Sequence, residues 1–598
     1  MKYNYSKRDE VPQKYRWDLT KWFVSDDAWY QEFADAKQYV TSLNQYKGHL
    51  FDKDNLYHVL SEYFQLDIRY NQLYAYAMLK HDEDLSISKY GKMLQKIQGL
   101  FNEFELNTSY ITPEILQNKD FDVDALIKKD ARLEKYRKIL EELKEEQPYV
   151  KDASTEEMIA ILTRNVHNYE NMSAVTLNSC LDYGTFKDEN GETIQLNTGN
   201  YRKYITSKNR HIRKKVYHML NNTRIKLSQP LATNLVSFMD SYASIAKVRG
   251  YHSSKEMFFK KDHIPMEIQE SLKKYTYQNI HYLQKYYRTY KKLLGVKKLE
   301  MYDLSAPVTS SSKFYTVEDA QKYVIEATKI LGSDYTEILE GGFRDRWIDY
   351  MAYQGKQSGG YSLSVYPKTS NILLSFTGVF DNVSTVAHEM GHAVNSDYAF
   401  RNNDAIYAYH DPILGEIASL SNEIYLANYV IYHDEFDKEE KIEIIIELLR
   451  TINSNFFGAV MENELEDAVY EKLDYNEVVT SDDLCNIMEE VTNQFYGDVI
   501  EKNEFVKYMW IPRSHYYKPY YLYKYATSIC GAVHFATRII NGDKKTLEDY
   551  KEFLKEGSVL QPNEVLLKYG IDLTKEDVYQ ELFQYYDYLL ETLKELVK

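Results

Sequence analysis

The residues whose types and spacing could do chemistry begin with two histidines four positions apart, His388 and His392, with Glu389 directly after the first. On a helix, positions i and i+4 lie on one face about a turn apart, so both imidazoles can reach one ion. Zinc accepts imidazole nitrogen readily, and a neighbouring glutamate can take a proton from water that the metal activates. Such an H-E-x-x-H match also arises by chance in roughly a few per cent of chains of this size, so the surrounding sequence has to decide.

A third metal ligand has two carboxylate candidates downstream. A catalytic zinc site usually has three protein ligands and leaves the fourth position to water. Glu416 and Glu423 lie seven positions apart on a predicted helix and therefore on a similar face. Spacing alone does not choose between them. His410 is a weaker candidate, because it precedes an Asp-Pro pair, where a loop or a helix start is expected.

An aromatic segment much later in the chain could supply hydrogen-bond donors. Residues 515–525 contain one imidazole, that of His515, and six tyrosine side chains. Hydrolysis through a tetrahedral intermediate needs donors aimed at the oxyanion. In a chain with 58 Tyr, however, aromatic packing accounts for most of these six.

The elements that must position these residues are predicted to be mainly helices. Residues 131–146 show the common pattern, in which apolar residues recur at helical spacing among charged ones. Residues 354–380 break this pattern with a Gly-Gly pair and two β-prone runs, which predict a small hairpin. Asp381 or Asn382 can then cap the helix that carries His388. An extended peptide could pair with a strand edge here, although a purely structural hairpin fits equally well.

Composition excludes several classes of partner. The net charge of −17 argues against nucleic acid and anionic membranes, which both require clustered Lys and Arg. Three widely separated cysteines outside any CxxC pattern indicate no disulfide framework and favour a reducing compartment. We find neither an apolar signal segment nor a run of 18 apolar residues, so we expect no membrane-spanning helix and a cytoplasmic location.

One further motif is interpreted as coincidence. Residues 458–463 (GAVMEN) are similar to the G-x-M-E-N motif of zinc aminopeptidases. They contain one residue too many and follow the H-E-x-x-H motif instead of preceding it. Chance helix sequence is the better explanation.

Three segments together resemble the oligoendopeptidase F group of the thimet oligopeptidase family of zinc peptidases. They are 372–393 (ILLSFTGVFDNVSTVAHEMGHA), 412–423 (PILGEIASLSNE) and 515–528 (HYYKPYYLYKYATS). Weaker likenesses, RWDLTKWF from residue 16 and RHIRKKVY at 210–217, extend the resemblance over nearly the whole chain. The three-part combination is highly specific, whereas H-E-x-x-H alone is not.

The resemblance implies which carboxylate completes the metal site. In the family, the zinc glutamate opens an E-x-x-S segment, which falls on Glu416 here. One Zn²⁺ per chain would then be held by His388, His392 and Glu416, with Glu389 as the general base. Glu423 is left with a supporting or helix-packing role.

Other implied residues are the substrate contacts. A His and Tyr pair that binds substrate and stabilises the oxyanion falls on His515, with Tyr523 and Tyr520 as the best tyrosine matches and Tyr521 and Tyr525 left open.

A Gly-rich loop that contacts substrate in relatives matches Gly359, Gly360 and Tyr361. The chain departs from many relatives at Asn395, where they carry another histidine. Because this position is not a ligand position, we expect metal binding to survive.

The resemblance also implies a fold and an activity. The expected fold is mainly α, a large helical body enclosing a deep substrate channel, with one small β-sheet next to the zinc-site helices. Residues 1–200 would form part of the channel wall and residues 201–598 the catalytic region. The expected activity is zinc-dependent endopeptidase cleavage of short, unstructured oligopeptides, with homo-oligomer formation left open.

Two alternatives remain. A metallo-exopeptidase would need a charge-matched group for the peptide terminus, and none is identified in the sequence. A peptide-binding protein without activity is disfavoured, because all five catalytic positions are intact.

Overall fold

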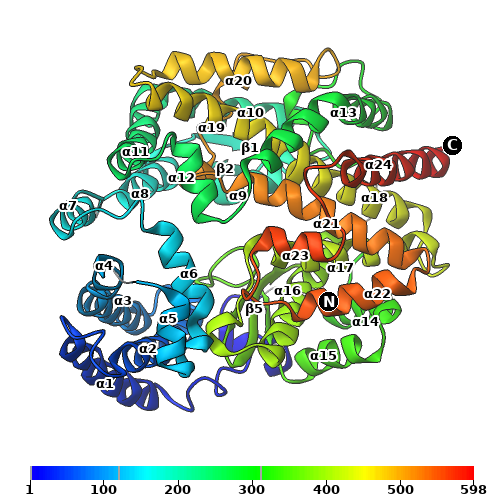
Figure 1. Cartoon of the computed structure of the whole chain (residues 1–598). Coiled ribbons are helices and arrows are strands. Elements are labelled where there is room, and N and C mark those ends of the chain that lie inside the picture. Colours follow the sequence, from blue (N-terminus) through cyan, green and yellow to red (C-terminus); the bar gives the residue numbers. More distant parts are fainter. Residues whose placement is uncertain (1–2, 4, 119–120, 164, 310–312) are drawn as a thin grey trace. The chain divides into compact units, whose positions relative to one another are not determined.

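The computed structural model describes the chain except residues 1–2, 4, 119–120, 164 and 310–312. Helices account for most of the described residues, and two small sheets are the only sheets among them (Figure 1). The mainly α prediction is therefore confirmed. The sequence predicts one sheet, and the second, a short two-stranded hairpin, has no clear signal in it.

The chain contacts divide the protein into two compact units, each made from three stretches. Unit 1 consists of Met1–Glu156, Lys313–Tyr429 and Arg538–Gln561, and unit 2 of Glu157–Ser312, Val430–Thr537 and Pro562–Lys598. The division expected at residue 200 falls inside unit 2, because the chain enters each unit three times and sequence position alone does not follow such crossings.

Unit 1 contains the H-E-x-x-H helix and the larger sheet. Its elements are α1 (Asp26–Ser42), α2 (Asn55–Glu83), α3 (Ser88–Thr108), α4 (Ile111–Gln117), α5 (Val123–Lys129), α6 (Arg137–Glu146), α14 (Val317–Thr328), α15 (Ser333–Arg344), β3 (Ile348–Met351), β4 (Tyr361–Val365), β5 (Lys368–Phe376), α16 (Phe380–Asn402), α17 (Pro412–Tyr432) and α22 (Lys544–Lys555). Helix α7 (Ala153–Thr163) crosses from unit 1 into unit 2 along the chain, and α17 ends just inside unit 2. Helix α21 (Leu522–Ile540) likewise ends just inside unit 1.

Unit 2 contains the aromatic segment and the two-stranded sheet. Its elements are α8 (His167–Val175), β1 (Thr185–Lys187), β2 (Thr193–Gln195), α9 (Thr198–Ile205), α10 (Arg210–Arg224), α11 (Ser228–Arg249), α12 (Ser254–Lys261), α13 (Met266–Leu293), α18 (Lys438–Ile452), α19 (Ala459–Asp474), α20 (Ser481–Tyr496), α21 (Leu522–Ile540), α23 (Pro562–Lys568) and α24 (Glu576–Val597).

The three-stranded sheet of unit 1 has the order β3-β5-β4. Strand β5 pairs antiparallel with β4, which confirms the predicted hairpin, and parallel with β3, which the sequence analysis did not anticipate. Strand β4 is consequently an edge strand of this sheet. One of its sides keeps backbone groups that an extended peptide could pair with.

A tight turn connects β5 to α16. Gly378 has a φ of 88°, and a Cβ there would lie 2.2 Å from the Phe314 ring, so only glycine fits. The Asn382 side chain accepts hydrogen bonds from the amides of Thr377 (2.7 Å) and Gly378 (3.1 Å). Asn382 therefore stabilises the turn from inside the helix. The N-cap itself is Val379, so the prediction that Asp381 or Asn382 caps the helix is wrong.

Helices α18 and α19 join through a π-helical turn, Asn453–Gly458, into one continuous helix, Lys438–Asp474. This helix is long and apolar enough to cross a membrane by length and composition, but 67% of its apolar window is buried inside the protein. Such burial is typical of a core helix. The GAVMEN sequence lies within it.

Candidate metal centre

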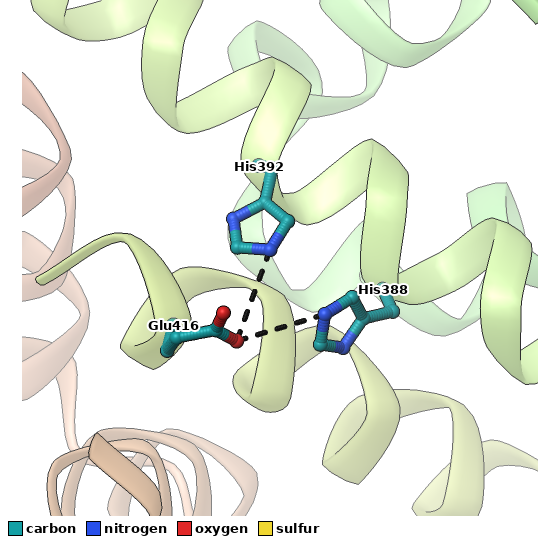
Figure 2. A group of neighbouring side chains, drawn as sticks. All are labelled: His388, His392 and Glu416. Carbon is teal, nitrogen blue, oxygen red and sulfur yellow. Dashed lines mark ion pairs between the residues drawn. The ribbon is translucent and has the colours of Figure 1, made fainter. Parts of the chain in front are cut away.

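Three side chains from two neighbouring helices meet at one point. His388 and His392 project from α16 and Glu416 from α17, and one donor atom of each lies within 4.8 Å of the others (Figure 2). The Glu416 Oε2 atom is 3.6 Å from His388 Nε2 and 3.8 Å from His392 Nε2. Two imidazoles and one carboxylate are the donor set of many catalytic zinc sites, so the residues fit a zinc ion.

A close approach of the two helices brings these ligands together. A Cβ at Gly391 would lie 2.6 Å from the Ser419 Cα and 2.9 Å from the Ala418 oxygen. Only glycine permits this backbone contact between α16 and α17. The Ser419 hydroxyl also donates to the Glu416 carboxylate (3.1 Å) and fixes its orientation.

The second nitrogen of each histidine has its own partner. His388 Nδ1 lies 2.7 Å from the Glu423 carboxylate, and His392 hydrogen-bonds to the backbone of Gly415. Such contacts fix the ring orientation and the tautomer, and so direct the Nε2 atoms towards the metal position. The Glu423 contact agrees with the supporting role expected for this residue. His410 packs against Gly415 and is not part of the ligand group.

Burial and neighbouring charges set the protonation of the centre. Burial opposes a charged His388, but the hydrogen bond to Glu423 and the surrounding carboxylates outweigh it and raise its pKa to about 9. Burial, together with the charges of His388 and His410, lowers the pKa of His392 well below its usual value. The carboxylates thus favour one positive charge where a metal cation would bind.

Glu389 lies beside the ligands and is 7% exposed. Burial, with the nearby charges of Glu416 and Glu423, raises its pKa to about 7 against the opposing effect of His388. A carboxylate with this pKa can accept and return a proton near neutral pH, as a general base must.

The predicted substrate loop passes directly over Glu389. Gly359 has a φ of 101°, and a Cβ at Gly360 would lie 3.6 Å from the Glu389 Oε1 atom and 3.4 Å from the side chains of Leu374 and Thr385. Tyr361, the first residue of β4, donates its hydroxyl to Asp82 of α2 (2.7 Å). The phenol of Tyr361 is therefore engaged by α2, and the glycines provide the close approach to Glu389.

A buried lysine that the sequence analysis missed anchors this loop. Lys356 Nζ donates to the backbone oxygens of Asp349 (3.0 Å), Met351 (2.8 Å) and Leu374 (2.8 Å) and pairs with the Asp349 carboxylate (2.6 Å). These contacts tie the loop to both β3 and β5. A single lysine in a polar stretch carries no sequence signal for such a role.

The aromatic segment lies in unit 2, in a short 3-10 helix, Ser514–Tyr517, and the start of α21. The His515 ring is 6.4 Å from Tyr521 and 5.9 Å from Tyr525, centroid to centroid, and these two tyrosines are 5.4 Å apart. All three side chains are half-buried. Burial and the charges of Arg513 and Lys518 lower the pKa of His515, so its imidazole is neutral at neutral pH.

Tyr520 and Tyr523, the tyrosines expected to contact substrate, point into the core of unit 2. They are 1% and 0% exposed. Tyr520 stacks on Tyr470 at 5.5 Å and Tyr523 on Phe259 at 4.9 Å. The structure therefore does not support the expected contact with substrate, which buried rings cannot make without rearrangement. Tyr521 and Tyr525, which had been left open, are the ones that group with His515.

Asn395 has a structural contact of its own. Its side chain is 2% exposed and donates to the backbone oxygen of Leu554 in α22 (3.0 Å). The residue therefore joins α16 to α22 and is not part of the ligand group.

Comparisons with known proteins identify the family of the chain. The model of peptidase family M3 matches residues 203–585. The chain is 29% identical to the group B oligopeptidase PepB of Streptococcus agalactiae (99% of this chain, 98% of the relative) and 29% identical to the oligopeptidase PepF of Bacillus subtilis (99% and 88%).

Solved structures show the same fold. A peptidase from Chlamydophila abortus matches with a TM-score of 0.87 and 26% identity, over 99% of this chain and all of that one. Oligoendopeptidase-F from Enterococcus faecium matches with a TM-score of 0.76 and 24% identity, over 96% of this chain and 99% of that one.

Proposed function

Because the chain belongs to peptidase family M3, we propose that it is a zinc-dependent endopeptidase that cleaves internal bonds of short, unstructured oligopeptides. The observation that carries this proposal is the meeting of His388, His392 and Glu416 directly beside Glu389. The names of the oligopeptidase relatives support short peptides as substrates. One Zn²⁺ per chain follows from the single ligand group found in the described part of the chain.

The proposed chemistry assigns a separate task to each residue. Zinc, when bound, supplies Lewis-acid polarisation of the scissile carbonyl and of the attacking water. Glu389 accepts a proton from that water and delivers it to the leaving amine. His388, His392 and Glu416 hold the ion, and Glu423 keeps the His388 ring in place.

The donors to the developing oxyanion are proposed to be His515 with Tyr521 or Tyr525. These three side chains form one half-buried group, and His515 is neutral, so it carries one N–H to donate. Removing one donor of this kind from a peptidase costs about 10²–10³ in kcat. Tyr520 and Tyr523 are left with a packing role.

An extended substrate is proposed to run along the edge of β4 and across Gly359 and Gly360. The absence of side chains at these glycines lets a peptide backbone approach Glu389. Enclosure in a channel, the arrangement implied by the family, would admit only extended chains and spare folded proteins. The cytoplasmic location is likewise proposed, and the free state of Cys180, Cys485 and Cys530 supports it.

The decisive experiment compares Glu389→Gln with the wild-type enzyme. Glutamine has the same shape and cannot act as a base, so we expect one bound zinc per chain and a loss of about 10²–10⁴ in kcat. Mass spectrometry of a peptide mixture, with metal content measured in parallel, checks both. Normal turnover by this variant would refute the mechanism.

A peptide blocked at both ends separates the proposed endopeptidase from an exopeptidase. An endopeptidase cleaves it, because it needs neither free terminus, and a chelator should stop the cleavage. If only peptides with a free end are cut, the exopeptidase alternative is correct.

A further inference from the structure

The segment that carries His515 is held at two points by one helix. Glu462 and Glu466 lie four positions apart on α19, so they share one face of it. Glu462 pairs with Arg513, two residues before His515, and Glu466 accepts a hydrogen bond from the amide of Tyr520, one residue before Tyr521. The two contacts therefore lie on either side of His515, and the second lies directly before Tyr521.

The contact at Tyr520 fixes an unusual backbone conformation. Tyr520 has a φ of 51°, in the left-handed region that non-glycine residues rarely adopt. Its amide lies 2.7 Å from the Glu466 Oε1 atom, and its ring is packed against Tyr470 and Phe259. This turn directs the Tyr520 ring into the core and the neighbouring Tyr521 towards His515. Left-handed residues persist only where their surroundings hold them.

Glu466 is itself held in place. Its second oxygen accepts from the Asn463 side chain (3.2 Å), and Asn463 accepts from Gln269 of α13. Glu466 is 1% exposed, and this burial raises its pKa to about 8 despite the amide of Tyr520. A glutamine at this position keeps an oxygen that can accept from the Tyr520 amide.

The contact at Arg513 is the more solvent-exposed of the two. Arg513 Nε lies 2.7 Å from the Glu462 carboxylate, which is 8% exposed, while the Arg513 side chain is 41% exposed. Glu462 belongs to the GAVMEN sequence, whose likeness to a zinc-site motif was interpreted as coincidence. Its position opposite Arg513 provides a structural reason for a carboxylate there.

We propose that Glu462 and Glu466 are positioning residues, which together hold His515 and Tyr521 in the geometry that catalysis requires. This inference rests on the proposed role of His515 and Tyr521 as donors to the oxyanion. Neither glutamate contacts the donor side chains directly; each acts through the backbone or side chain of the segment. Misplacement of a catalytic group by about 1 Å can cost about 10²-fold in rate, so such support is functionally important.

The central test is the pair Glu466→Met and Glu466→Gln. Methionine is similar in size but accepts no hydrogen bond, which leaves the Tyr520 amide buried and unpaired. We expect kcat to fall on the order of 10–100-fold, with KM within a few-fold of wild type, because the donors act mainly on the transition state. Glu466→Gln keeps an oxygen for the amide and should restore kcat to within a few-fold.

Controls separate positioning from general damage. Glu471→Met alters an exposed glutamate of the same helix and should leave kcat unchanged. Metal content and thermal melting report whether each variant is folded. If Glu466→Met does not fold, Glu462→Gln carries the test, with a smaller expected loss of kcat because Arg513 is partly exposed to solvent.

The distinguishing readout is non-additivity. In a His515→Ala/Tyr521→Phe background the two donors that Glu466 is proposed to position are already gone, so Glu466→Met should reduce kcat little further. A full additional loss there, or unchanged kcat in single Glu466→Met and Glu462→Gln variants, would overturn the positioning role while leaving the proposed donors intact. If His515→Ala and Tyr521→Phe themselves leave kcat unchanged, the donor assignment fails and this inference fails with it.

Discussion

The metal centre in unit 1 and the His515 segment in unit 2 reach their geometry by different means. The candidate metal ligands project from two regular helices, α16 and α17, whose backbones touch at Gly391. The His515 segment is irregular: it passes through a 3-10 turn and a left-handed Tyr520 before α21 begins. In helices α16 and α17, spacing along the chain sets the direction of each side chain. In the His515 segment, spacing does not predict these directions.

The difference shows which side-chain positions a sequence motif can predict. On a helix, a separation of four residues places two side chains on one face whatever the rest of the protein does. In an irregular segment, one residue with a positive φ redirects every side chain after it. The positions of the candidate ligands can therefore be inferred from helical spacing, whereas the proposed donors of the aromatic segment lie in a stretch that contacts helix α19.

The largest expected effect tests the helical half of this comparison. Glu416→Ala should lose the metal and all measurable activity, because two imidazoles alone hold zinc weakly. Glu423→Ala should retain metal, with affinity reduced about 10–100-fold by loss of the partner of His388. Elemental analysis after dialysis and titration with a zinc indicator measure both. If Glu423→Ala loses the ion and Glu416→Ala keeps it, the assignment of the third ligand is wrong.

An intermediate effect tests the irregular half. Tyr521→Phe or Tyr525→Phe removes a hydroxyl from the group around His515, and at least one should lower kcat about 10²-fold at unchanged melting temperature. Tyr523→Phe is the matched control, since its hydroxyl lies in the core near Asp262 (3.3 Å). Steady-state kinetics on a quenched fluorescent peptide measures kcat. A large loss only in Tyr523→Phe would restore the original tyrosine assignment.

The smallest expected effect, about tenfold per pH unit, is on zinc affinity as the pH changes. Without metal, His388 is protonated below its pKa of about 9, and a metal must displace that proton. Zinc affinity should therefore rise with pH up to about 9, by about tenfold per unit for one displaced proton. Glu423→Gln removes the main contact that raises this pKa, so its affinity should level off at lower pH.

The same variant sharpens the pH test. Above pH 9, the zinc affinity of Glu423→Gln should lie furthest below that of the wild type. At lower pH the two affinities should approach each other, because protonation of His388 weakens zinc binding more in the wild type than in the variant. Competition with a chelator at several pH values checks this. Parallel curves for the two proteins would show that His388 does not carry the displaced proton.

The sequence predicted the parts of the site that regular structure carries. The H-E-x-x-H helix, the hairpin before it and the placement of His388 and His392 on one helix face follow from periodicity and spacing. The selection of Glu416 over Glu423 needed the family resemblance, because both lie on one face of α17. Their different positions become visible only in the structure, where Glu423 contacts His388 Nδ1 and Glu416 faces the Nε2 atoms.

Other parts depend on contacts that no local pattern encodes. Tyr520 adopts a left-handed conformation in which its amide donates to Glu466, and nothing in the local sequence predicts this conformation for a tyrosine. Lys356 looks like any surface lysine until β3 and β5 provide backbone oxygens for it. The parallel strand β3 was missed for a similar reason, since its partner lies beyond an intervening loop.

The contact between Asn395 and Leu554 has a consequence for the synthesis of the protein. Unit 1 takes its last stretch, Arg538–Gln561, long after the ribosome has made the metal ligands, and α16 packs against α22 from that stretch. A nascent chain that ends before α22 leaves the ligand helix with an uncovered face. The helix that carries His388 and His392 therefore gains this cover only after residues 538–561 have been made.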